Sequence, residues 1–168
     1  LLAVVLFAQP QPVKWTTTYE ITDDAVLVTI HADIEEGWHL YSQNIEDGGP
    51  IPTSFHLDST SSYTTSGIWT ESESHVEFDS NFDMDLAYFS NSADFTANLE
   101  PSVADFVVSG ELEFMVCNDV MCLPPTFIDF NVEVMDAPVP SIFKGLGTTF
   151  WLGMLGGFAA LLMPCIFP

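Results

Sequence analysis

Apolar and polar residues alternate with a period of two along most of this chain. The alternation is clearest over residues 26–34 and 128–134, where apolar side chains occupy every second position. Successive side chains of a β-strand point to opposite faces, so the pattern predicts strands with one buried face. Further strands are expected at residues 15–21, 38–42, 53–58, 82–89, 95–99 and 106–116.

Turn-forming sequences separate these segments. Glycine, proline and short polar residues favour chain reversal, and they gather at residues 46–50, Ser66-Gly67, Glu100-Pro101 and Ser109-Gly110. About eight short strands at this spacing predict an all-β fold, an immunoglobulin-like β-sandwich over residues 13–136. The run Ala137-Pro138-Val139-Pro140 indicates a stiff linker over residues 137–144.

Two uncharged apolar segments flank the predicted sandwich. Residues 1–8 stop at Gln9-Pro10, as the hydrophobic region of a signal peptide does before its cleavage site; the alternative is a buried first strand. Residues 145–168 are long enough to cross a hydrocarbon core of about 30 Å. We expect them to form a transmembrane α-helix, truncated within its span and part of a helical bundle rather than a lone anchor. These segments predict an exported sandwich.

Charge is distributed unevenly along the chain. There are 24 Asp and Glu residues and 2 lysines, which give a formal net charge of −22 at pH 7. All the acidic residues fall within residues 13–136, whereas Lys14 and Lys144 lie near the ends of that segment. Binding to nucleic acid is excluded because the phosphate backbone requires basic side chains. Attraction to anionic lipid headgroups is excluded for the same reason.

Three cysteines carry the candidate chemistry. Cys117 and Cys122 flank Asn118-Asp119, which favours a chain reversal, so we expect a hairpin in which the two thiols face each other. A structural disulfide and a redox pair both fit this arrangement. The short loop limits the stability that a structural disulfide could add, which favours a functional pair. The third cysteine, Cys165, lies in the apolar segment at the end of the chain.

The surroundings of the two hairpin cysteines differ. Cys117 ends an apolar strand, so its sulfur is expected to be the more buried. Cys122 precedes Pro124-Pro125, which lack backbone N–H groups and keep the return strand open at its start. A partner can therefore reach Cys122 more easily. Nearby anionic groups, Asp119 among them, disfavour the thiolate form of the free pair.

Four motifs together resemble the start of the DsbD family of membrane thiol:disulfide interchange proteins. They are Gly37-Trp38-His39-Leu40-Tyr41-Ser42, Gly49-Pro50-Ile51-Pro52-Thr53, Cys117-Asn118-Asp119-Val120-Met121-Cys122-Leu123-Pro124-Pro125 and Met163-Pro164-Cys165-Ile166-Phe167-Pro168. The resemblance extends over nearly the whole chain. This chain departs from the family in the loop between the two exported cysteines. Four residues separate Cys117 from Cys122 here, one fewer than in the family.

The resemblance implies a protein-disulfide reductase that works as an electron relay. Cytoplasmic thioredoxin would reduce a membrane domain, which reduces a thioredoxin-like domain of the same full-length protein and then the sandwich. The sandwich would reduce periplasmic thioredoxin-fold acceptors, namely disulfide isomerases and proteins of cytochrome c maturation. By position, Cys122 corresponds to the nucleophile that forms mixed disulfides, Cys117 to the resolving cysteine and Cys165 to a membrane relay thiol.

The same resemblance implies a location and a shield for the cysteines. The protein would reside in the bacterial inner membrane, with the sandwich in the periplasm, and would use no cofactor and no metal. An aromatic residue from a loop would cover the pair. We assign this cap to Phe82, which shortly precedes the strand that contains Tyr88.

Two other classes of function compete with the relay. The histidines are not at metal-binding spacing and are interpreted as surface or strand residues: His31, His39, His56 and His75. Met115 and Met121 flank the cysteines, so a membrane-tethered copper module that holds Cu(I) by thiolate and thioether ligands is one alternative. A non-redox β-sandwich scaffold is the other.

The charge distribution generates a prediction about salt. Stability should rise between about 0.1 M and about 1 M NaCl, because the Debye length falls from about 10 Å to about 3 Å and screens repulsion between carboxylates. Thermal unfolding across this series measures the effect. A melting temperature that stays constant or falls would show that the acidic groups are too dispersed to repel one another.

Overall fold

The computed structural model describes residues 11–80, 82–139 and 150–155. The chain divides into two compact units, Leu1–Pro138 and Val139–Pro168. In the second unit residues 150–155 are helical, and no helix in the described ranges is both long and apolar enough to cross a membrane. The predicted signal peptide (residues 1–8), most of the predicted membrane segment and Cys165 lie outside the described residues.

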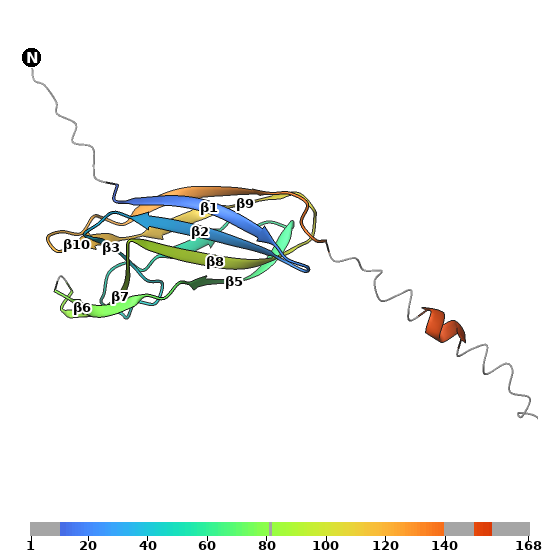
Figure 1. The fold of residues 1–168 in the computed structure, drawn as a ribbon, viewed down its shortest axis with the longest axis horizontal. Helices are drawn as coiled ribbons and strands as arrows, with labels where there is room; N and C mark the ends of the chain where they lie inside the picture. The colour runs from blue at the N-terminus through green and yellow to red at the C-terminus, as the bar shows by residue number, and fades with distance from the viewer. Residues whose placement is uncertain (1–10, 81, 140–149, 156–168) are drawn as a thin grey trace, which may run out of the picture. The chain divides into compact units, whose positions relative to one another are not determined.

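The first unit is an antiparallel all-β domain, as the sequence predicts (Figure 1). One layer, sheet A, pairs four strands in the order β1-β2-β8-β5. The bounds are β1 Val13–Ile21, β2 Val26–Ile34, β8 Ser92–Pro101 and β5 Tyr63–Glu71.

The facing layer consists of two sheets. Sheet C pairs three strands in the order β11-β9-β4, with bounds β11 Thr126–Val134, β9 Phe106–Phe114 and β4 Ser54–Leu57. Sheet B pairs four strands in the order β10-β3-β7-β6, with bounds β10 Val116–Asn118, β3 Trp38–Tyr41, β7 Met84–Ser90 and β6 His75–Asp79. The predicted strand 106–116 is therefore divided: β9 belongs to sheet C and, after Met115, β10 belongs to sheet B.

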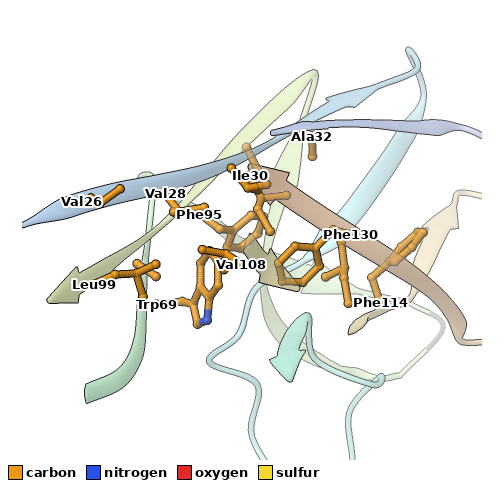
Figure 2. Packing of buried hydrophobic residues seen from close by; sticks show 14 of the residues in the cluster. Val26, Val28, Ile30, Ala32, Trp69, Phe95, Leu99, Val108, Phe114 and Phe130 are labelled. Atoms are coloured by element: carbon orange, nitrogen blue, oxygen red, sulfur yellow. The ribbon is translucent and has the colours of Figure 1, made fainter. Parts of the chain in front are cut away.

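The main hydrophobic core lies between sheets A and C. Every second residue of β2 and β8 is buried on one side, and β9 and β11 bury theirs against it. Figure 2 shows Val28, Ile30 and Phe95 of sheet A pointing toward Val108 and Phe130 of sheet C. Each such side chain stabilises the fold by about 1.5–3 kcal/mol when fully buried.

Two strands, β5 and β6, were not predicted from the sequence. In β5 only Tyr63 and Trp69 are buried, and the pairing with β8 shifts register between Thr65 and Trp69. Gly67, which was interpreted as part of a turn, lies in this irregular stretch with φ +73°. In β6 only the terminal Asp79 is buried, so neither strand has an apolar alternation.

Ser109-Gly110 was also interpreted as a turn, and that prediction is wrong. Gly110 lies within β9, where it pairs with Phe130 on one side and Leu57 on the other. A Cβ at this position would collide with the backbone carbonyl oxygen of His56. Gly110 therefore permits the close approach of β4 to β9.

Gly110→Ala should destabilise the domain by about 1–3 kcal/mol, because the added methyl group must push the backbone of β4 away. Denaturant unfolding measures the loss. Val107→Ala is a matched control in the same strand, since Val107 is largely exposed. Equal stability of the Gly110→Ala and native proteins would show that β4 can move at no cost.

Candidate redox-active site

Cys117 and Cys122 form a disulfide across a hairpin, as the sequence predicts. Their Cα atoms are 4.0 Å apart, and the two residues form an isolated antiparallel bridge. The backbone N–H of Leu123 donates a hydrogen bond to the carbonyl oxygen of Val116 at 2.9 Å. The return leg of the hairpin is therefore aligned with β10 at the disulfide.

Asn118 organises the loop between the two cysteines. Its side-chain Oδ1 accepts hydrogen bonds from the backbone N–H groups of Val120 and Met121, both at 2.9 Å. Its own N–H donates to the carbonyl oxygen of Met121 at 2.9 Å. These bonds use the polar backbone groups of the loop and leave its apolar side chains outward: Val120 is 87% exposed and Met121 is 50% exposed.

The two sulfur-bearing residues differ in exposure, as predicted. Cys117 is 0% exposed, whereas Cys122 is only half-buried. Cys117 is held within β10, but Cys122 is followed by Pro124-Pro125, and regular pairing resumes only at Thr126. Prolines cannot donate to a β-ladder, so the chain next to Cys122 stays open to an approaching partner.

The register of sheet B places several functional side chains on the same face as Cys117. Cys117 pairs directly with His39, and Tyr41 pairs with Tyr88. Directly opposed residues of an antiparallel pair project to the same side of the sheet. The residues that alternate with them face the main core instead: Leu40, Phe89 and Val116.

A second, smaller hydrophobic cluster surrounds the disulfide. Its buried members are Tyr41, Leu86 and Cys117, and the half-buried side chains packed against it are Ile45, Phe82, Met84, Tyr88, Met115 and Cys122. Phe82 lies in the connection between β6 and β7, and its ring meets that of Tyr41 edge-on at 5.9 Å. The structure thus brings the predicted cap residue into the cluster that contains both cysteines.

Asp79, at the end of β6, is a buried carboxylate beside this cluster. It accepts a hydrogen bond from the Tyr41 hydroxyl at 2.6 Å, and its Oδ2 lies 3.8 Å from Nε2 of His39. Burial of the phenol, followed by its hydrogen bond to Asp79, raises the pKa of Tyr41 far above its usual value. Tyr41 therefore remains a hydrogen-bond donor at every physiological pH.

His39 is the imidazole closest to the disulfide in register. Its ring packs against Tyr88 at 4.8 Å and against Tyr41 at 5.7 Å. Burial lowers the pKa of His39 below its usual value, although the carboxylates of Asp79, Asp119 and Glu77 act in the opposite direction. The side chain is therefore neutral near pH 7.

A pocket of about 160 Å³ opens beside His39. Its polar lining includes Glu77, Asp79 and Asp119. The Tyr88 hydroxyl donates a hydrogen bond to Glu77 at 2.6 Å. This bond, with burial as the second cause, raises the pKa of Tyr88 to about 12.

Sequence reasoning did not identify His39, Tyr41 or Asp79 as members of the site. His39 and Tyr41 were visible as alternate residues of one short strand, which is the signal that could have paired them. Asp79 gave no signal, because it is 38 residues from Tyr41 in sequence and is brought there by the pairing of β3, β7 and β6.

His31 and His56 lie apart from this cluster, where His31 contacts Asp94 at 2.7 Å and His56 contacts Ser54 at 3.3 Å. His75 is at its edge, since its ring packs against that of Tyr88 at 6.5 Å. In the described part of the chain no group of three or more His, Cys, Asp or Glu side chains is arranged to hold a metal ion.

Comparisons with known proteins identify a sequence family and a similar fold. The sequence model of the family described as "Thiol:disulfide interchange protein DsbD, N-terminal" matches residues 7–133. The chain is similar in structure to the N-terminal periplasmic domain of ScsB from Proteus mirabilis, with 14% identity, a TM-score of 0.54, and coverage of 90% of this chain and 56% of that chain. This similarity shows a shared fold.

A second structure with similarity is the Neisseria meningitidis DsbD N-terminal domain in the reduced form. The identity is 16%, the TM-score is 0.48, and coverage is 76% of this chain and 90% of that chain. The comparison with curated protein sequences gives no match.

Phe82→Ala should increase the rate at which the reduced cysteine pair reacts with oxidised glutathione, because removal of the ring opens the cluster around both sulfurs. We expect the rate to increase by about tenfold, because the sulfurs become more accessible while their chemical reactivity is unchanged. Phe78→Ala is the matched control, since Phe78 belongs to the same hairpin but is 59% exposed. Unchanged kinetics of Phe82→Ala would remove the cap role from Phe82.

Proposed function

Because this chain belongs to the family of DsbD N-terminal domains, we propose that it is a protein-disulfide reductase module that passes electrons from Cys117 and Cys122 to thioredoxin-fold acceptors. The observation that carries the proposal is the unequal exposure of the two cysteines in a short hairpin. A disulfide that only stabilises the fold gains nothing from unequal exposure of its two cysteines. A thiol–disulfide exchanger uses it to direct its partner to one sulfur.

The exchange follows from the positions of the two sulfurs. In the reduced module the Cys122 thiolate attacks the disulfide of an acceptor and forms a mixed disulfide, and one acceptor sulfur leaves as a thiolate. Cys117 then attacks Cys122, which re-forms the internal disulfide and releases the second acceptor sulfur. The acceptor gains two electrons, and the module returns to the disulfide form that the structure contains.

The exposed loop supports a docking role for this end of the domain. Val120 and Met121 project from the hairpin next to Cys122, and methionine adapts its shape to different partners. A partner that covers this loop also approaches Cys122 from its open side. Selectivity would then come from the geometry of docking rather than from an unusually reactive thiol.

The wider relay forms part of the proposal. The module would receive electrons from a thioredoxin-like domain of the same full-length protein, which a membrane domain containing Cys165 supplies from cytoplasmic thioredoxin. The sandwich would lie in the periplasm and the rest of the protein in the bacterial inner membrane. Membership of the DsbD N-terminal family supports this arrangement, as do the apolar segments at residues 1–8 and 145–168.

Single-cysteine variants test the assigned roles. Cys117→Ala should trap a mixed disulfide between Cys122 and an oxidised thioredoxin, because the resolving sulfur is missing. Cys122→Ala should trap at least tenfold less, because the remaining Cys117 is buried. Non-reducing electrophoresis with mass spectrometry measures the adduct.

The control is the double variant, which should trap none. A larger yield from Cys122→Ala than from Cys117→Ala would exchange the two roles. Absence of any adduct from either single variant, with both proteins folded, would favour the non-redox scaffold.

A further inference from the structure

His39 and Cys117 are direct cross-strand neighbours. Their Cα atoms are paired in the antiparallel register of β3 and β10, and the side chains of such a pair lie on one face with Cβ atoms about 4.5–5.5 Å apart. The imidazole is largely buried, with its side chain 17% exposed. The buried sulfur of Cys117 therefore has a titratable nitrogen base beside it.

Three carboxylates lie near the imidazole of His39. Asp79 and Glu77 approach from β6 and Asp119 from the cysteine hairpin, and the aromatic rings of Tyr41 and Tyr88 enclose it from β3 and β7. Asp79 is the closest, with Oδ2 3.8 Å from Nε2. A positive charge that forms on the ring is stabilised by these groups.

From this geometry we propose that His39 is the proton acceptor for Cys117 in the step that resolves the mixed disulfide, with Asp79 as the residue that stabilises the resulting imidazolium. The inference rests on the proposed function, in that Cys117 is taken as the resolving cysteine. The proposal assigns a general base, the imidazole of His39, to a step that would otherwise depend on spontaneous ionisation of the Cys117 thiol.

The step is balanced as follows. The Cys117 thiol transfers its proton to a ring nitrogen of His39, and the thiolate attacks the Cys122 sulfur. The bond between Cys122 and the acceptor breaks, and its electron pair leaves with the acceptor sulfur as a thiolate. Water or the imidazolium returns a proton to that thiolate. The Cys117–Cys122 bond forms, and the acceptor is reduced.

The resting state of His39 suits this role. Burial keeps the imidazole neutral near pH 7, so it is able to accept a proton. The Cys117 residue is buried, and burial disfavours an isolated thiolate. Transfer of the thiol proton to His39 allows the Cys117 thiolate to form as an ion pair with the imidazolium instead.

Reaction with dithiobis(nitrobenzoic acid), a small aromatic disulfide, separates the two steps. The reduced chain should release one thionitrobenzoate anion when Cys122 attacks the reagent and a second when Cys117 resolves the adduct. Stopped-flow absorbance records both phases between about pH 5 and about pH 9, the range in which histidine and cysteine titrate.

The second phase of the native protein should be independent of pH around neutrality and should slow as the pH falls through the lowered pKa of His39. In His39→Gln the second phase should be about 100-fold slower near pH 7, the scale of general base catalysis. The rate of this second phase should then increase with pH until the Cys117 thiol itself is ionised. The rate of the first phase should be unchanged.

His75→Gln is the matched control, because His75 also packs against Tyr88 but is not paired with Cys117; it should behave like the native protein. Asp79→Asn keeps a hydrogen-bond acceptor for Tyr41 and removes the negative charge that stabilises the imidazolium. The pH at which the second phase begins to slow should therefore move to a lower value. This second variant tests the proposal even where His39→Gln does not fold.

The proposal would be overturned by a second phase in folded His39→Gln that matches the native pH profile, or by a pH inflection in Asp79→Asn that does not move. Equal slowing of both phases by His39→Gln would overturn it as well, since it would indicate a general structural effect. The reagent is not a protein. Failure of the native chain to exchange with thioredoxin, with the His39-dependent phase intact, would therefore contradict the proposed function alone.

Discussion

The register of β10 against β3 is the constraint on which the site depends. β10 has only three residues, yet Val116 and its partner Leu40 are both buried in the main core. Because side chains alternate between the two faces of a sheet, burial of Val116 places Cys117 on the opposite face. A slip of one residue would move Cys117 into the core and expose Val116. Packing of one valine thus determines where the disulfide lies.

Sheet B therefore has two faces with different physical roles. Its inner face completes the main core, and its outer face carries the small cluster around the disulfide together with His39 and Asp79. The residues of the main core and those packed around the disulfide form two separate clusters.

The electrostatics of the site follow from a composition that provides almost no cations. With 2 lysines in the chain, both distant in sequence from the cysteine pair, a half-buried histidine is the group near the disulfide that can become positive. Its neighbours Asp79 and Glu77 are already engaged by the hydroxyls of Tyr41 and Tyr88. The site combines the neutral imidazole of His39 with carboxylates that are held in place by hydrogen bonds. These carboxylates stabilise a positive charge on the imidazole once it accepts a proton.

The sequence by itself determined the all-β class, most of the strands and the cysteine hairpin, because these features depend on local alternation and on turn residues. It did not reveal β5 and β6, whose buried positions are too few to give a pattern, and it misread Gly110, whose role depends on the approach of another strand. Phe82 was assigned to the disulfide from the family resemblance, but only the tertiary structure decided that His39, Tyr41 and Asp79 gather there as well. Their proximity arises from strand pairing between segments distant in sequence, and such pairing leaves no trace in the local order of residues.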